Sequence, residues 1–194
     1  MFIQTEATPN PATLKFLPGR IVLESGTAEF REGEDAASRS GLAARLLDVD
    51  GVSGVFFGFD FITVTKAGGD WAHLKPAILA AIMEHFMSNR PVMAASAVGS
   101  AAVGAEVGEE FFAEGDEAIV ATIKELLDTR VRPAVAQDGG DITFRGFRDG
   151  TVYLNMRGSC AGCPSSTATL KHGIENLLRH FVPEVESVEA MEPA

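Results

Sequence analysis

The sequence predicts an α+β fold of two small domains joined by an Ala/Gly-rich linker. Its 194 residues suffice for two domains of about 80–100 residues each. A hydrophobic content of 46% and a charged content of 22% are ordinary for globular chains, so each half can bury a core. Residues 91–115 lack the periodic large apolar residues of a packed helix. We expect domains at residues 1–90 and 115–194, with the linker at residues 91–114.

The first domain is expected to contain five strands and two helices. Period-two alternation and turn residues predict short strands at residues 2–6, 13–17 and 21–25. Leucines at helical spacing predict a helix across residues 38–51, and a hairpin follows at residues 52–65. The apolar face of the last helix is formed by Trp71, Leu74, Ile78, Ala81, Ile82 and His85.

The second domain is expected to have the order α-β-β-α-β. An amphipathic helix begins after Asp116, bends at Pro133 and stops at Gly139-Gly140. Asp149-Gly150 predicts a hairpin between two strands. The first of these strands should turn Ile142, Phe144 and Gly146 to one side, and the second Val152, Leu154 and Met156. The next helix has an apolar stripe, and residues 185–190 form a last short strand.

Phe111 and Phe112 are the two large apolar residues near the end of the linker. They could dock on a domain surface or begin the next helix. We expect them to begin the helix, because the helical pattern of the second domain follows closely.

The chain has two cysteines, Cys160 and Cys163, in the stretch RGSCAGCPSS. With no export signal at the N-terminus, we expect a reducing compartment, where a Cys-x-x-Cys motif more often binds metal or acts catalytically than forms a structural disulfide. The motif lies between a strand and a helix whose first residue is Pro164. Cys163 would then be the N-cap, and the helix dipole would lower the cysteine pKa. Hydroxyls of Ser165, Ser166 and Thr167 could surround an anionic sulfur.

Two thiols alone leave several kinds of site open. A redox-active disulfide also requires a cysteine with a lowered pKa, but its usual setting is a thioredoxin-like βαβ unit. Here the motif follows a hairpin. A zinc site needs two further ligands, for which His172 and His180 are the nearest candidates, although they lie eight residues apart on one helix. A symmetric dimer would instead supply four thiolates, the usual complement of an iron–sulfur cluster.

Two longer stretches resemble a known family. The segment RGSCAGCPSSTATLKHGIENLL together with VRPAVAQDGGDI resembles the NifU C-terminal, or Nfu-type, iron–sulfur cluster domain. MFIQTEATPNPATLKFLPGR resembles the N-terminal domain found ahead of it in Nfu proteins. The resemblance implies that Cys160 and Cys163 bind the cluster. Its second motif is matched here by Arg132, Asp138, Gly139, Gly140 and Asp141. For these five residues we expect a structural role, ending a helix and starting a strand.

The resemblance also implies a function and partners. We expect a soluble, non-enzymatic iron–sulfur scaffold or carrier, which holds a 4Fe–4S cluster between two C-terminal domains and passes it to apo-proteins by ligand exchange. A 2Fe–2S cluster is the smaller alternative. Expected partners are a second copy of the chain, apo client proteins and upstream assembly proteins, with neither nucleic acid nor membrane. The formal net charge of −11 with no basic segment agrees with the absence of nucleic acid.

We expect a bacterial cytoplasm, or a mitochondrial matrix if a leader has been removed. The main rival function is a thiol–disulfide oxidoreductase with Cys160 as nucleophile, and the third is a zinc-bridged structural dimer. The first domain has no cysteine, so we expect it to recognise partner proteins.

Overall fold

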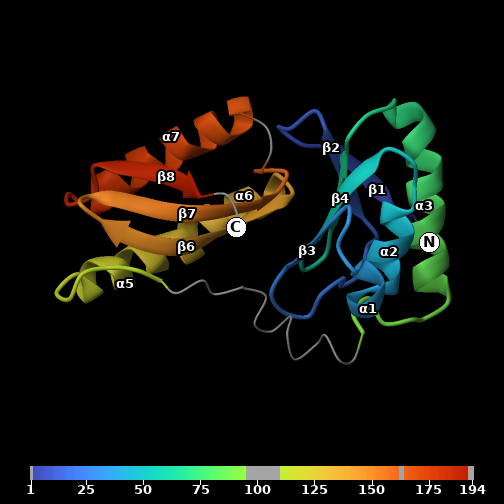
Figure 1. The fold of residues 1–194 in the computed structure, drawn as a ribbon, viewed down its shortest axis with the longest axis horizontal. Coiled ribbons are helices and arrows are strands. Elements are labelled where there is room, and N and C mark those ends of the chain that lie inside the picture. Colours follow the sequence, from blue (N-terminus) through green and yellow to red (C-terminus); the bar gives the residue numbers. More distant parts are fainter. Residues whose placement is uncertain (1, 95–109, 162–163, 192–194) are drawn as a thin grey trace. The chain divides into compact units, whose positions relative to one another are not determined.

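The computed structural model describes residues 2–94, 110–161 and 164–191 and divides the chain into two compact units, Met1–Ala105 and Glu106–Ala194 (Figure 1). Each unit contains one β-sheet and its own helices. The α+β class predicted from the sequence is therefore confirmed. Within the described part of the chain, no helix has the length and apolar character needed to cross a bilayer.

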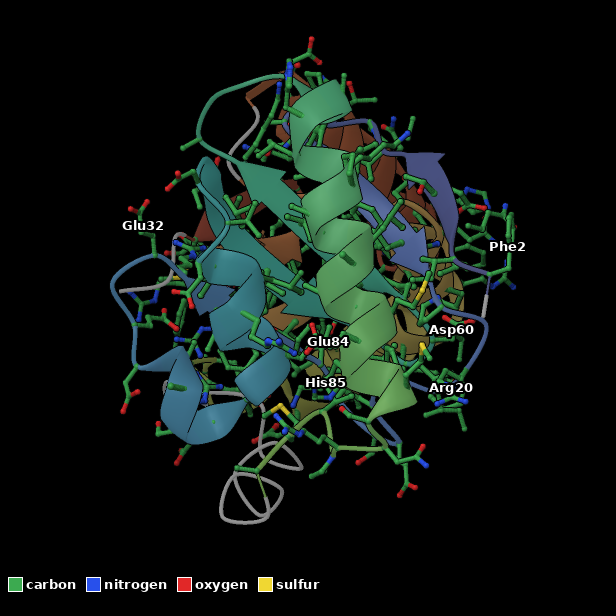
Figure 2. All side chains as sticks on the ribbon, turned by 90° about the vertical axis from the view of Figure 1, so that its right-hand side faces the viewer. Phe2, Arg20, Glu32, Asp60, Glu84 and His85 are labelled. Atoms are coloured by element: carbon green, nitrogen blue, oxygen red, sulfur yellow. The ribbon has the colours of Figure 1, made fainter. Side chains whose placement is uncertain are left out.

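The first unit is an antiparallel five-stranded sheet with strand order β1-β2-β5-β4-β3. Helices α2 and α3 lie on one face of this sheet, in front of the strands in Figure 2. The core between them includes Phe16, Phe30, Leu46, Ile62 and Ile78. The elements are β1 (Gln4–Ala7), β2 (Thr13–Leu17), β3 (Ala28–Arg31), α1 (Ala36–Arg39), α2 (Gly41–Leu47), β4 (Val52–Phe57), β5 (Ile62–Lys66) and α3 (Trp71–Met87).

The strand predicted at residues 21–25 is wrong, and the third strand is β3 instead. The amides of Val22 and Leu23 both donate to the carbonyl of Phe59, at 2.7 and 3.2 Å, so this segment is a loop held against the turn between β4 and β5. Val22 and Leu23 are still buried in the core. Their apolar pattern reflects burial rather than strand pairing.

The helix predicted across residues 38–51 is two short helices, α1 and α2. Ser40 separates them with extended backbone at φ −154° and acts as the N-cap of α2 by accepting the amide of Ala43. Its hydroxyl also donates to the carbonyl of Val92 at 2.5 Å. Val92 and Met93 are buried in the first core, so the described start of the segment expected to be a linker packs with the first unit. Residues 95–109 of that segment lie outside the described residues.

The second unit is a three-stranded sheet with order β6-β7-β8. Strands β6 and β7 form an antiparallel hairpin through Asp149-Gly150, as predicted, with φ +49° and +72° at the two turn residues. Strand β8 pairs parallel to β7, with helix α7 as the crossover. The elements are α5 (Glu117–Leu126), η1 (Leu127–Val131), α6 (Arg132–Gln137), β6 (Gly140–Arg148), β7 (Thr151–Gly158), α7 (Pro164–Phe181) and β8 (Ser187–Met191).

A π-helical turn, η1, precedes α6 next to Pro133, where a bend was predicted. Proline has no N–H to give to the carbonyl four residues earlier, and the wider turn accommodates this loss. The amide of Arg132 accordingly donates to the carbonyl of Leu127, five residues back.

A bulge in β6 changes the predicted alternation. The register shifts between Phe144 and Gly146, so Phe147, rather than Gly146, is the next core residue and lies opposite Val152. On β7 the predicted face of Val152, Leu154 and Met156 is confirmed as buried.

The prediction that Phe111 begins a helix is wrong. Phe111 forms an isolated parallel bridge with Gly146, and α5 starts only at Glu117. Its N–H donates to the carbonyl of Arg145 at 3.2 Å, and its own carbonyl accepts the amide of Phe147 at 2.8 Å. A Cβ on Gly146 would lie 2.5 Å from the Phe111 ring, so the missing side chain provides the space for docking.

Candidate cysteine site

Cys160 lies two residues after the end of β7, on the loop that leads into α7. Because β7 and β8 are parallel, the chain must leave the sheet here and return through a crossover. The motif therefore stands in a parallel βαβ unit as well as at the end of a hairpin, and the expectation that it does not was wrong. The predicted start of the helix at Pro164 is confirmed. Cys163, the predicted N-cap, lies outside the described residues, so only Cys160 has surroundings that can be described.

The side chain of Cys160 is packed into the second hydrophobic core and is only 5% exposed. It lies directly over Gly140, where a Cβ would come within 2.5 Å of Sγ and 2.7 Å of the carbonyl oxygen of Arg157. The hydroxyl of Thr167 donates to the backbone carbonyl of Cys160 at 3.0 Å. Thr167 thus fixes the backbone of the loop, whereas the sequence had suggested a hydroxyl near sulfur.

The structure brings the cysteine loop and the Asp-Gly-Gly-Asp turn together. Gly140 and Gly158 are register partners at the start of β6 and the end of β7. Beyond this pair, Ser159 donates its backbone amide to the carbonyl of Gly139 at 3.3 Å and its hydroxyl to the carbonyl of Asp138. The turn does end a helix and start a strand, as expected. Gly140 of this turn also packs directly against the side chain of Cys160.

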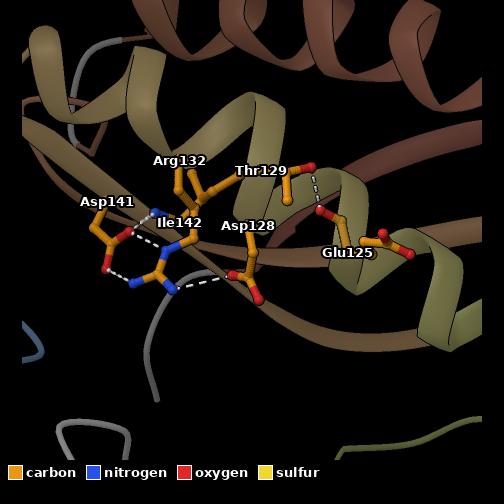
Figure 3. A network of polar contacts seen from close by, with 6 residues as sticks. All are labelled: Glu125, Asp128, Thr129, Arg132, Asp141 and Ile142. Carbon is orange, nitrogen blue, oxygen red and sulfur yellow. Dashed lines mark hydrogen bonds and ion pairs between the residues drawn. The ribbon is translucent and has the colours of Figure 1, made fainter.

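Arg132 and Asp141, two residues of the second motif, form a bidentate ion pair (Figure 3). Nε and Nη2 of Arg132 lie 2.9 and 3.1 Å from the two carboxylate oxygens of Asp141. The carboxylate also accepts the amide of Ile142 at 2.9 Å, and Asp128 binds the remaining nitrogen at 3.1 Å. Hydrogen bonding to Asp141 raises the pKa of Arg132, so the guanidinium stays charged. The pair ties α6 to the first residues of β6.

The electrostatics of Cys160 differ from the expectation for the loop. Burial raises the pKa of the Cys160 thiol to about 11, and the negative charges of Asp138 and Asp141 add to this, while a hydrogen bond with Ser159 opposes it. Cys160 is therefore a neutral thiol near pH 7 in this conformation. The lowered pKa expected from an N-cap position concerns Cys163, outside the described residues.

The histidines considered as zinc ligands, His172 and His180, are exposed on α7. His180 packs edge-on against the ring of Phe181, with centroids 4.9 Å apart. Among residues 2–94, 110–161 and 164–191, no three His, Cys, Asp or Glu side chains converge on a point where a metal could bind.

Sequence reasoning missed Ser159 and the steric role of Gly140. Ser159 stands next to Cys160 in the sequence, but its partners at Asp138 and Gly139 are about 20 residues earlier. In the sequence, the only sign of this contact is that the Asp-Gly-Gly-Asp and Cys-x-x-Cys motifs follow one another. The distances between them come from the fold.

Two family models match the chain. The model "Scaffold protein Nfu/NifU N terminal" matches residues 3–89, and the model "NifU-like domain" matches residues 123–189. A human protein, "NFU1 iron-sulfur cluster scaffold homolog, mitochondrial", is 53% identical over 191 residues, which cover 97% of this chain and 71% of the human protein. This chain belongs to the Nfu/NifU family. The family resemblance drawn from the sequence is confirmed.

Other relatives of this Nfu/NifU chain are similar over the same length. A Drosophila sechellia protein with the same name as the human one is 51% identical, and "NifU-like protein 4, mitochondrial" of Arabidopsis thaliana is 50% identical. The matches cover 97% of this chain in both cases, but 64% and 65% of the two relatives. The chain therefore spans just under two thirds of the length of these two relatives.

Proposed function

We propose that this Nfu/NifU chain is an iron–sulfur cluster scaffold and carrier. It binds a 4Fe–4S cluster between the second domains of two copies, through Cys160 and Cys163 of each, and passes it to apo-proteins. The observation that carries the proposal is the position of Cys160, on the loop that leads into a crossover helix and against the Asp-Gly-Gly-Asp turn. The names of the relatives, which include "iron-sulfur cluster scaffold", support the cargo.

The donor chemistry fits this cargo only if two chains combine. An iron–sulfur cluster is usually held by four thiolates, and one chain has two cysteines. A two-fold symmetric pair presents the same surface twice, so two Cys-x-x-Cys loops supply the full set. A cluster held in this way leaves when the pair separates, which suits delivery.

Loading requires two changes at Cys160. The side chain is 5% exposed, so it must come out of the core before it can reach iron. It must also lose a proton, because the thiolate is the form that binds metal, and burial holds its pKa near 11. Exposure removes the main cause of the raised pKa, so the two changes favour each other.

Release is the reverse exchange. A client thiolate forms a bond to iron as the bond between iron and Cys160 or Cys163 breaks. The proton lost by the client thiol returns to the freed cysteine, and Cys160 can then refold into the core as a neutral thiol. No electron changes place, and the client changes only by losing its S–H proton and gaining its bond to iron. The chain acts as a carrier and not as an enzyme.

We assign cluster binding to residues 115–194 and recognition of client and assembly proteins to residues 1–90. Residues 91–114 connect them, with Val92 packed on the first unit and Phe111 on the second sheet. A mitochondrial matrix or a bacterial cytoplasm would suit the carrier, and the names of the relatives favour the first. The names of the relatives, which include "iron-sulfur cluster scaffold", favour the carrier over the rival function as a thiol–disulfide oxidoreductase.

Anaerobic reconstitution tests the proposal. The purified full chain is incubated with iron, sulfide and a reductant, and its iron, acid-labile sulfide and mass are measured together. We expect about four irons and four sulfides per dimer. Cys160→Ser should abolish both the uptake and the dimer, whereas Thr169→Ala on the exposed side of α7 should leave both unchanged. A full cluster on the Cys160→Ser variant would refute the site, and two irons per dimer would refute the cluster type.

A further inference from the structure

Four large apolar side chains of the first unit are more than half exposed to solvent. They are Phe2, Ile21, Phe59 and Met87, at 84%, 52%, 54% and 72% exposure. A single exposed apolar residue is ordinary, whereas several gathered on one surface indicate contact with another molecule. Their arrangement therefore decides whether they form one surface.

Two of these residues are joined by the contact between a loop and a turn. The amides of Val22 and Leu23, which follow Ile21, both donate to the carbonyl of Phe59, at 2.7 and 3.2 Å. Val22 and Leu23 are buried in the first core, whereas Ile21 and Phe59 are exposed beside them. The same backbone contact thus holds the core residues inside and the two apolar neighbours outside.

The other two residues lie at the same end of the first unit. Nη1 of Arg20, next to Ile21 in the loop, donates to the carbonyl of Phe86 at 3.4 Å, and its guanidinium lies 5.4 Å from the Phe86 ring. Met87, the next residue, ends α3 beside this loop. Strand β1 begins two residues after Phe2 and pairs there with the end of β2, just ahead of the loop. We call the surface of Phe2, Ile21, Phe59 and Met87 the apolar end.

The apolar end also has one cation and one anion. Figure 2 shows Phe2, Asp60 and Arg20 along the same edge of the first unit. Asp60 directly follows Phe59 in the turn between β4 and β5. Both charged residues are exposed, and within residues 2–94 neither has an ion-pair partner. The two opposite charges are therefore available to a partner.

A second copy of the chain fits this combination. In a pair related by a two-fold axis, a residue that meets a second residue across the interface does so twice, once in each direction. Arg20 of one copy can then meet Asp60 of the other at two places, while the apolar side chains cover one another. A surface with charges of a single sign would repel its own copy, so the presence of both signs favours self-pairing.

We propose that the cluster-free chain pairs through the apolar end, with Arg20 of each copy bound to Asp60 of the other. The pair is weak, because four side chains per copy form a surface smaller than the roughly 800 Å² per partner of a standard interface. The net charge of −11 opposes pairing, but at about 0.15 M salt charges more than about 8 Å apart are largely screened.

Pairing brings two second units into one particle and so raises the concentration at which each meets the other. Two Cys-x-x-Cys motifs are then held near one another before iron arrives. This use in cluster loading rests on the proposed carrier function, whereas the pairing itself does not.

Sedimentation equilibrium of the iron-free full chain, with a reductant to prevent disulfides between chains, tests the pairing. The wild-type chain should be monomeric at about 10 µM and a mixture of monomer and dimer at about 0.5 mM. Phe59→Ser should weaken the association about tenfold. Phe181→Ser removes a ring of the second unit that is 46% exposed, and as the control it should leave the association unchanged.

Charge reversal tests the two ion pairs directly. Arg20→Asp makes two aspartates face each other and Asp60→Arg two arginines, so each variant alone should associate about tenfold more weakly than the wild-type chain. An equimolar mixture of the two variants should pair about as well as the wild type, because each reversed charge then meets an opposite one. A change that acted only through the fold would not be repaired by mixing.

A wild-type chain that stays monomeric at the higher concentration would overturn the proposal and leave the apolar end to a different partner. A mixture of the two charge variants that associates no better than its components would overturn it as well. A pair that forms but takes up no iron on reconstitution would leave the pairing standing and refute the carrier function.

Discussion

The guanidinium of Arg132 binds both carboxylate oxygens of Asp141, at 2.9 and 3.1 Å. Asp141 has only 6% of its side chain exposed, and both this partner and the amide of Ile142 stabilise its charge. The ion pair holds the first residue of α6 against the first residues of β6. Gly140, the first residue of β6, packs against Cys160, so the ion pair stabilises the site indirectly.

Replacing Arg132 should destabilise the second unit, because it removes the bidentate bond of the guanidinium to the buried carboxylate of Asp141. Arg132→Ala is expected to cost about 1–3 kcal/mol of unfolding free energy. Asp128→Ala removes the exposed partner of the same guanidinium and should cost only about 0.3–0.5 kcal/mol. Urea denaturation followed by circular dichroism measures both, and equal losses would show that the buried pair has no special weight.

Adding a methyl group at Gly140 should disturb the site sterically. Its Cβ would meet Sγ of Cys160 at 2.5 Å and the carbonyl oxygen of Arg157 at 2.7 Å, and the second of these belongs to the backbone. Gly140→Ala is expected to cost about 1–3 kcal/mol. Gly173→Ala is the control, since its Cβ would meet nothing within 4 Å on α7, and it should stabilise by about 0.5–1 kcal/mol. A neutral Gly140→Ala variant would contradict this packing.

These examples show what the sequence could predict. The helices with apolar stripes and the Asp149-Gly150 hairpin were predictable, because local periodicity and turn chemistry determine them. The strand predicted at residues 21–25 is wrong, because a buried loop has the same apolar pattern as a strand. Docking of Phe111 against Gly146 and contact of Cys160 with Gly140 join residues distant in sequence, which local patterns cannot reveal.

The ionisation of Cys160 should follow its burial. In a Cys163→Ser variant, the rate of alkylation by iodoacetamide should rise about tenfold per pH unit up to pH 9.5 without a plateau, because the pKa is about 11. The same chain unfolded in urea should level off near an ordinary thiol pKa of about 8.5. The fold favours the protonated thiol, so the stability it contributes is present below about pH 8.5 and is lost as the pH rises toward 11. A plateau below pH 9 in the folded chain would contradict the burial.

His85 should make the first unit sensitive to mild acid. The residue is 3% exposed, and Nε2 has no hydrogen-bond partner in the described part of the chain. Burial, together with the charges of Arg45 and Arg90, lowers its pKa. The unfolded imidazole binds a proton below about pH 6.5, whereas the folded one resists it. Stability is therefore present above that pH and is lost as the pH falls through 6.5 toward the lowered value.

Unfolding of the first unit can be followed at Trp71, the one tryptophan of the chain. His85→Gln should flatten the decline in stability between pH 7 and pH 5. His73→Gln, at an exposed position on the same helix, should leave the decline as it is in the wild-type chain. If the two variants behave alike, the acid sensitivity has another origin.

Removing the Phe111 ring should loosen the part of the second unit that precedes α5. Its centroid lies 5.2 Å from that of Tyr153, and the guanidinium of Arg148 lies 5.0 Å from it. Phe111→Ala is expected to cost about 1–2 kcal/mol in the second unit and to speed cleavage near residue 111 in limited proteolysis. Phe112→Ala, whose ring is 39% exposed, should have a smaller effect on both measurements. The reverse order would show that the ring of Phe112, not Phe111, is the one that docks.

The two glycines of the Asp-Gly-Gly-Asp turn are required for different reasons. Gly139 has a φ of +81°, which other residues rarely adopt, whereas Gly140 has an ordinary φ and lacks room for a Cβ. A glycine codon altered at one base specifies alanine, serine, cysteine, valine, arginine, aspartate, glutamate or tryptophan. Each of these brings a Cβ against the sulfur of Cys160. Every missense change that a single-base mutation can produce at position 140 therefore also disturbs the packing of Cys160.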